Sequence, residues 1–311
     1  MSGDECLGFR FRNVLLCWVS LWLAQPALAL RNAKDLDDKT FSALGVVLGH
    51  RPDNDLHENP GSATLLCNGP QGSVAITAAH VVPEVAGRRN VFLRCADTRE
   101  CLKEFHNPAY RDRVARVVDS VRLTDIDPNG MAALPPNLLL KQISGDLALV
   151  RLDRVLGYAR IRLPAEPIPQ EVIAKNPVGV VFGFGVSTGV KNDFFKRSGW
   201  IRALQYAEEN ILHTYSQHST ATALCAGDSG SPWLLRGKDG AGYLYGIASF
   251  AVALDDRGAP VKKPPCSGEQ SAMAFYASVP HRMEWLMKTL SRKDWCGEAA
   301  AALVGNAVLE D

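Results

Sequence analysis

Short apolar runs that favour β-strand recur along most of the chain and are separated by turn-forming residues. Strands are therefore predicted at 44–48, 63–67, 73–77, 90–95, 101–105, 178–182, 200–205, 233–235 and 243–250. One helix is predicted at 282–290, where apolar residues recur at helical spacing, and its apolar stripe is interpreted as core packing. Many short strands with a single terminal helix favour an all-β fold over an α/β fold.

Polar and turn-rich segments mark where these predicted strands are interrupted. Residues 31–40 are polar and charged and are expected to form a mobile N-terminal arm. Glycine, proline, asparagine and aspartate fill residues 49–61, which are expected to form a surface loop. The proline-rich stretch 163–169 suits a connector between two β units.

The composition is that of an ordinary globular chain. It has 311 residues, of which 47% are hydrophobic, and a formal net charge of +1. This length suits one large β domain or two smaller units. Lysine and arginine are interspersed with aspartate and glutamate, so the sequence has no basic stripe for nucleic acid and no nucleic-acid partner is expected.

The N-terminus has the features of a signal peptide. Two arginines precede an apolar run at 14–24, and small residues at 27–29 suit signal peptidase. Residues 1–29 are therefore predicted to be removed, leaving a secreted or periplasmic chain that begins at Leu30. The apolar run is short for a membrane span, so a retained anchor is the less favoured alternative and no stable membrane association is expected.

Export implies an oxidising compartment, in which cysteines pair. Six cysteines follow the leader: Cys67, Cys95, Cys101, Cys225, Cys266 and Cys296. Cys95 and Cys101 are close enough in sequence to close a small loop. Paired spacings such as C-x-x-C are absent, so neither a metal site nor a cofactor is expected.

The strongest chemical signal is the stretch Cys-Ala-Gly-Asp-Ser-Gly-Ser-Pro at 225–232. Glycines on both sides of Asp228 and Ser229 indicate a tight turn that presents one hydroxyl beside inward-facing amides. A serine nucleophile needs a base and an orienting acid. His80 ends the run Ile-Thr-Ala-Ala-His, and Asp146 begins the run Asp-Leu-Ala-Leu-Val, so the order along the chain is His, Asp, Ser.

These three motifs, in one-letter code TAAH, DLALV and GDSGSP, resemble those of the chymotrypsin/trypsin-like serine proteases, whose chain order is also His, Asp, Ser. The similarity covers about 42–290, and GDSGSP is its most specific part. It implies an exported member of bacterial type, with one protease domain at 30–311. Within that domain the resemblance implies two six-stranded antiparallel β-barrels, at about 41–162 and 172–290, a C-terminal helix, and a tail at 291–311.

The chemistry implied by this resemblance is peptide hydrolysis through an acyl-enzyme. Ser229 would attack a peptide carbonyl while His80 takes its proton, and Asp146 would hold the imidazole in the required tautomer. The backbone amides of Gly227 and Ser229 would form the oxyanion hole. The implied protein is a monomeric serine endopeptidase whose partners are protein or peptide substrates.

The substrate pocket is assigned through the same resemblance. Its floor would be Ala223, and the other expected lining residues are Leu224, Ser249, Phe250, Ala251 and Ala274. Ser249 would face Asp146, and Phe250 would cover the subsites before the scissile residue. The floor carries no acid, and alanine replaces glycine at 251 and 274, so a small or medium apolar residue is predicted before the scissile bond.

Two disulfide assignments also come from the resemblance. Cys225 and Cys266 match the family bridge that ties the serine turn to the wall of the specificity pocket. The family also has a cysteine directly after the histidine, but Val81 occupies that position here. Cys67 and Cys296 are therefore left either to pair with each other or to remain free.

The chain departs from the family pattern in two places. The segment 111–142 is longer than in the family and is interpreted as a surface insertion that either shapes the cleft or decorates the first barrel. The Ile-Val-Gly-Gly terminus, whose amine pairs with the acid before the serine, is absent. Asp228 is therefore expected to be held by an internal donor, such as an arginine, a backbone amide or a tyrosine.

Two alternatives to an endopeptidase remain at this point. A protease scaffold can serve as a binding protein, although the loss of a triad residue that such proteins usually show is not seen here. An esterase-type acyl hydrolase would use the same residues, and the sequence does not distinguish it from an endopeptidase.

Overall fold

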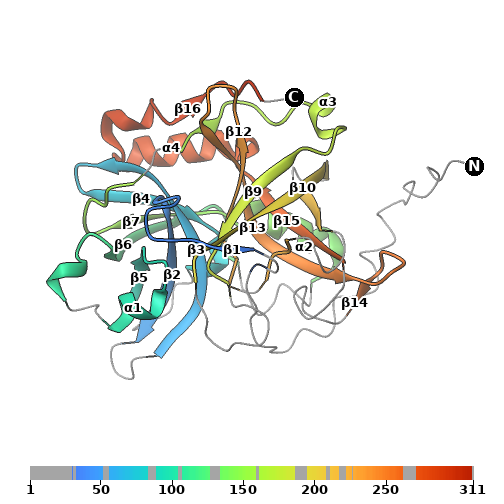
Figure 1. Cartoon of the computed structure of the whole chain (residues 1–311). Coiled ribbons are helices and arrows are strands. Elements are labelled where there is room, and N and C mark those ends of the chain that lie inside the picture. Colours follow the sequence, from blue (N-terminus) through green and yellow to red (C-terminus); the bar gives the residue numbers. More distant parts are fainter. Residues whose placement is uncertain are drawn as a thin grey trace, which may run out of the picture.

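The computed structural model contains two closed antiparallel β-barrels of six strands each and a helix near the C-terminus (Figure 1). It describes residues 30, 33–51, 56–82, 89–103, 107–126, 134–158, 161–185, 195–207, 211–216, 222–225, 227–261 and 271–309. The predicted all-β fold with two six-stranded barrels is confirmed.

The first barrel closes in the order β2-β3-β4-β7-β6-β5. Its strands are β2 (Leu44–Arg51), β3 (Leu56–Gly69), β4 (Gly72–Thr77), β5 (Arg89–Leu93), β6 (Val114–Arg122) and β7 (Ala148–Leu152). The prediction of a loop throughout 49–61 is wrong, because β2 and β3 extend into it and pair there, for example Gly49 with Glu58. Ladder pairing uses backbone groups, so the polar side chains of this segment do not prevent it.

The second barrel closes because β9 pairs with both β12 and β10. Its strands are β9 (Val178–Gly183), β10 (Arg197–Ala207), β11 (Ile211–Ser216), β12 (Pro232–Arg236), β13 (Gly242–Leu254) and β15 (Ser271–Ser278), and the short β14 (Pro260–Val261) pairs with β13. Sequence patterns did not identify β11 or β15. Both are buried on both faces, apart from the half-buried Tyr215 in β11, so neither shows the alternation of a half-buried strand.

The helices correct two further predictions. The expected strand at 101–105 is instead α1 (Thr98–Lys103), a helical turn that the Cys95–Cys101 disulfide holds against the end of β5. The segment 111–142 is not a surface insertion throughout, because β6 is a barrel strand between β5 and β7. It is followed by α2 (Pro136–Gly145), which leads directly to Asp146.

The predicted mobile arm is also wrong for residues 33–40. Within it, β1 (Lys34–Asp35) pairs with β10, and Asp35 Oδ1 accepts a hydrogen bond from Arg197 Nε at 2.7 Å. Leu30, the described residue nearest the N-terminus, is only 2% exposed and packs in the core of the second barrel. The arm is therefore ordered by long-range pairing that its polar composition does not reveal.

The remaining elements join the chain ends to the two barrels. The predicted C-terminal helix is confirmed as α4 (Met283–Lys293), and α3 (Gln170–Ile173) precedes β9. The connector strand β8 (Leu163–Pro164) pairs in parallel with β16 (Val304–Gly305). Among the described residues, none of the helices is both long and apolar enough to traverse a membrane.

A disulfide and a shared core bind these parts together. Cys67 in β3 is bonded to Cys296, just after α4, so these two cysteines pair rather than remain free. One hydrophobic cluster includes Leu65 and Ile76 of the first barrel together with Leu234 and Ile247 of the second. The barrels therefore pack against each other, and residues at their junction are held by both.

Candidate active site

His80 lies where the first barrel meets the second. The strand β4 ends at Thr77, and His80 follows in the 3-10 helix η3 (Ala79–Val81). The residues on both sides of His80 in this helix are buried. The backbone amide of His80 donates to Asp146 Oδ1 at 3.0 Å, and its Nδ1 lies 2.6 Å from Asp146 Oδ2. These two contacts fix both the position and the orientation of the imidazole.

Asp146 is brought to His80 by strand register. Asp146 lies two residues before β7, which pairs with β4 so that Ala148 is opposite Thr77. The Asp146 side chain is fully buried, and its Oδ2 accepts a further hydrogen bond from Ser249 Oγ at 2.5 Å. Both carboxylate oxygens are thus engaged, and Ser249 faces Asp146 as predicted.

The electrostatics of His80 result from two opposing effects. Burial alone lowers the pKa of His80, but the negative charge of Asp146 and its hydrogen bond raise that pKa by more, so the net pKa is above the ordinary value of 6.5. The contact with the Asp146 carboxylate keeps the proton of the neutral imidazole on Nδ1, so Nε2 is available as a base. The raised pKa means that a proton accepted at Nε2 is held more stably than on a free histidine.

The serine turn is pinned to both barrels. On one side, the carbonyl of Ser229 accepts a hydrogen bond from the amide of Ser62 in β3 at 2.7 Å. On the other side, the amide of Gly230 donates to the carbonyl of Ala248 in β13 at 2.8 Å. Gly230 has φ +82°, and a Cβ there would lie 2.0 Å from the Ser62 carbonyl oxygen, so only glycine fits this position.

The serine turn is also close to the segment that carries His80. A Cβ placed on Gly61 would lie 2.4 Å from the side chain of Val81, which follows His80, and 3.0 Å from the carbonyl oxygen of Ser229. The serine turn and the segment of His80 are therefore so close at Gly61 that there is no room for a side chain between them. No hydrogen bond between Ser229 Oγ and His80 is present among the described contacts, and such bonds commonly tighten only when substrate binds.

The amides predicted for the oxyanion hole have no competing acceptor. Gly227 and Ser229 are both partly exposed, and within the described chain no acceptor takes either backbone amide. Gly227 has φ +89°, a conformation that a side chain disfavours. Two neighbouring unpaired amides beside an accessible hydroxyl form the arrangement that binds a developing oxyanion.

Asp228 lies beneath this turn and is fully buried. Burial raises its pKa to about 7, although the amides of Gly185 and Cys225, the positive charge of Arg197 and the backbone of Leu30 each lower it. The two amides donate to its carboxylate oxygens at 2.8 and 3.0 Å. The expectation of internal donors is confirmed, and the chain near Leu30 adds to them.

The residues assigned to the pocket lie in the segment before the serine turn and on strands β13 and β15. Ala223 and Leu224 are buried just before it, and Ala251 of β13 pairs with Ala274 of β15. Phe250 is half-buried, with its ring tilted against that of Phe275 at a centroid distance of 6.1 Å. Cys225 is disulfide-bonded, but the expected partner, Cys266, lies outside the described residues.

Three residues that hold this site were not predicted from the sequence. Ser62 and Gly61 of β3 contact the serine turn, and Arg197 of β10 contributes its charge to Asp228. No local motif marks any of them, because each acts on a residue far away in the chain. The one signal in the sequence was the pair of adjacent cations at 196 and 197. The structure shows that both are buried.

Comparisons with known proteins identify the architecture. No family model matches the chain, and no curated protein sequence matches it. Among solved structures, human heparin binding protein and an atomic-resolution structure of HBP each match with TM-score 0.53 and 16% identity, over 84% of this chain and 96% of theirs. The fold is chymotrypsin-like. HL collagenase matches with TM-score 0.51 and 16% identity, over 84% of this chain and 98% of its own.

This likeness establishes the fold alone. The matched chymotrypsin-like structures include one protein named for binding and one named as a collagenase, so the shared fold does not by itself assign an activity.

Proposed function

We propose that the protein is a serine endopeptidase of bacterial type that acts on proteins or peptides. In this mechanism Ser229 Oγ attacks the carbonyl carbon of the scissile bond while His80 accepts its proton. The amides of Gly227 and Ser229 stabilise the oxyanion of the tetrahedral intermediate. The protonated His80 then gives its proton to the leaving amine, and water hydrolyses the resulting acyl-enzyme by the same route.

The observation that carries this proposal is the double contact between His80 and Asp146. The carboxylate meets both the backbone and the ring of His80, and a third donor, Ser249, holds it in place. A solvated surface pair would not need this burial or this number of donors. A histidine that is oriented by a buried aspartate, beside a serine with unpaired amides, serves a reaction that transfers a proton.

The specificity proposal rests on the alanines near the serine turn. Ala223 is fully buried and carries no charge, so a basic residue before the scissile bond would have no partner. Methyl groups at Ala251 and Ala274 occupy space next to each other on paired strands. We propose cleavage after small or medium-sized apolar residues, with Ala223, Leu224, Ser249, Phe250 and these two alanines lining the pocket.

The proposed setting is an exported monomer. Residues 1–29 form the leader and residues 30–311 the mature protease. Two disulfides among the described cysteines, Cys67–Cys296 and Cys95–Cys101, are consistent with an oxidising compartment outside the cytoplasm.

Labelling with a fluorophosphonate probe tests the mechanism directly. The wild-type protein is expected to be labelled and Ser229→Ala not, while both unfold at the same temperature. Labelling of Ser229→Ala would contradict the mechanism. No labelling of the folded wild type would favour a binding protein on this scaffold. Comparing peptide anilides with the matching esters then distinguishes an endopeptidase from an esterase, because an esterase would hydrolyse only the esters.

A further inference from the structure

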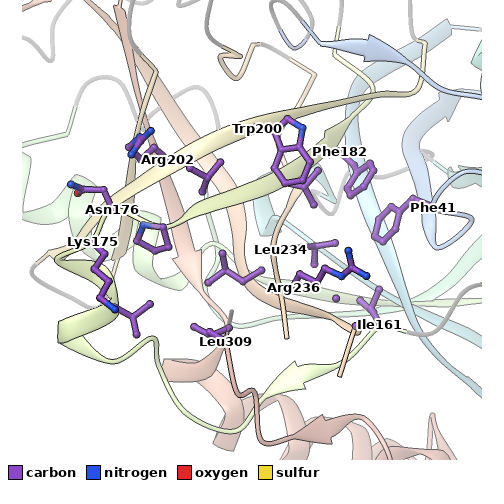
Figure 2. A pocket seen from close by; sticks show the side chains of 17 residues that line it. Phe41, Ile161, Lys175, Asn176, Phe182, Trp200, Arg202, Leu234, Arg236 and Leu309 are labelled. Carbon is purple, nitrogen blue, oxygen red and sulfur yellow. The ribbon is translucent and has the colours of Figure 1, made fainter. Parts of the chain in front are cut away.

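A groove of about 710 Å³ lies along one side of the second barrel, away from the proposed catalytic residues. Side chains of β9, β10 and β12 form its floor, and residues near α3, the C-terminus and the first barrel form its margins (Figure 2). Neither the proposed triad nor any residue assigned to the substrate pocket is among its lining residues. Its volume lies in the range of specific binding sites.

The floor of the groove is apolar and is set by strand register. Val180 of β9 lies opposite Trp200 of β10 on one side and opposite Leu234 of β12 on the other, so the three form a row across the sheet. Trp200 is 68% exposed, and Val178 in the next row is 44% exposed. Phe41 and Phe182, stacked at a centroid distance of 4.0 Å, extend the apolar surface at one end.

Positive charges flank this floor on two sides. Arg202 pairs with Val178 across β10 and β9, and Lys175 lies on the same side of the groove in Figure 2. Arg236 reaches toward Ile161 on the opposite side in the same view. Arg202 and Arg236 are exposed, and neither forms an ion pair with a carboxylate in the described chain. None of the described lining residues is acidic.

We propose that this groove binds a segment of a partner polypeptide that carries both acidic and apolar side chains. Tryptophan and arginine are enriched at protein–protein hot spots, and this groove exposes both. Cations on two sides of the floor suit an occupant with more than one carboxylate, whereas a fatty acid has a single charged head. β9 is paired along both edges, so the segment is held by side chains rather than by strand addition.

The test uses a random phage-displayed peptide library on a Ser229→Ala background, which prevents cleavage if the protein is a protease. Peptides that bind the Ser229→Ala protein carrying Arg202→Glu and Arg236→Glu are first removed from the library. The remaining peptides are then selected for binding to the Ser229→Ala protein with both arginines intact. Selected peptides are expected to be rich in aspartate, glutamate and large apolar residues. In fluorescence anisotropy, Trp200→Ala is expected to weaken their binding about tenfold or more.

Arg292→Glu is the matched control, because Arg292 is an exposed arginine on α4 that does not line the groove. It is expected to leave peptide binding unchanged. The single change Arg202→Gln replaces the double variant if thermal unfolding shows that the latter is not folded.

Three results would overturn the proposal. The first is that no acidic peptides are selected after depletion, and the second is that the peptides bind equally well with and without Trp200→Ala. The third is that dodecanoate, a fatty acid with a single carboxylate, displaces the peptides and that peptides with only one carboxylate bind equally well. Fluorophosphonate labelling of Trp200→Ala with Ser229 intact reports the proposed activity separately. The binding site and the proposed activity can therefore fail independently.

Discussion

Nδ1 of His80 lies 2.6 Å from Oδ2 of Asp146, and the backbone amide of His80 donates to the other oxygen of the same carboxylate. One buried acid therefore holds the histidine through both its ring and its main chain. This arrangement controls the protonation of His80, and it leads directly to a pH dependence.

Activity is expected to rise with pH as His80 loses its proton. Since the neutral imidazole is the base and the pKa of His80 is above 6.5, the midpoint of kcat/KM should lie above that of free histidine. Asp146→Asn is expected to reduce kcat by about 10⁴-fold and to lower the midpoint of the remaining activity. The measurement is hydrolysis of an alanine p-nitroanilide across pH, and a flat profile between about pH 5 and 8 would contradict a histidine base.

The raised pKa of His80 also makes stability depend on pH. As pH rises, activity is expected to rise, whereas the stability contributed by His80 is expected to fall. The protonated His80 paired with Asp146 stabilises the fold fully below the unfolded pKa of about 6.5, and this contribution is lost as pH rises through the folded pKa. The wild type should therefore lose stability relative to His80→Ala over the pH range in which activity appears. Urea unfolding of both proteins across that range measures the difference.

Ser249→Ala should slow catalysis by removing a hydrogen bond to the Asp146 carboxylate. Ser249 Oγ donates to Asp146 Oδ2 at 2.5 Å, and a hydrogen bond to a charged group contributes about 1.5–3 kcal/mol, so kcat is expected to fall about 10- to 100-fold. The pKa of His80 should rise, because the carboxylate loses a donor that shares its charge. Ser249→Thr keeps the hydroxyl and should recover much of the rate. Equal kcat in wild type and Ser249→Ala would show that this bond does not position Asp146.

Enlarging the proposed pocket should change its preference. Ala251→Gly and Ala274→Gly remove adjacent methyl groups, so kcat/KM for a phenylalanine substrate should rise about tenfold relative to the alanine substrate. Ala253→Gly is the matched control, because it removes a methyl group from the same strand, β13, outside the proposed pocket. A peptide library should show cleavage after alanine or valine by the wild type. Preference for arginine or lysine would mean that Ala223 is not the floor.

Arg197 should matter most at alkaline pH. Burial raises the pKa of Asp228 to about 7, so its ionisation costs stability as pH rises from about 4 to 7, and the charge of Arg197 reduces that cost. Arg197→Met is expected to destabilise the protein more at high pH, where Asp228 is ionised, than in acid. Arg202→Met, an exposed position on the same strand, should have little effect. An equal loss of stability at both pH values would argue against an electrostatic role.

A chain with a methionine or tag ahead of Leu30 is expected to be active. The amides of Gly185 and Cys225, the backbone of Leu30 and the charge of Arg197 all favour the Asp228 carboxylate. The backbone N–H of Leu30 remains a donor when residues precede it, so a free terminal amine is not required. The measurement is activity with the extension shown to be intact by mass spectrometry. Activity that appears only after cleavage between Leu30 and Leu44 would mean that the protein is a zymogen.

Much of the fold follows from local sequence. The elements that local sequence did not predict were missed for a common reason. Apolar runs of β-prone residues marked β4, β9 and β12, and the helical spacing of apolar residues marked α4. Buried strands such as β11 and β15 contain small and polar residues whose partners come from other strands, so no periodic pattern shows them. The arm at 33–40 was missed because its order comes from pairing with β10.

The sequence by itself determined the candidate chemistry of this protein: a serine between glycines, a histidine after a buried strand and an aspartate before another. Each of these motifs lies within a few residues, so its chemistry can be inferred without the fold. Only the tertiary structure decided which residues hold these motifs in place. Ser249 is hydrogen-bonded to Asp146, Ser62 is hydrogen-bonded to Ser229, and the charge of Arg197 acts on Asp228. The groove around Trp200 likewise exists only because barrel closure places β9 between β10 and β12. Such contacts join distant parts of the chain through strand register, which local composition does not encode.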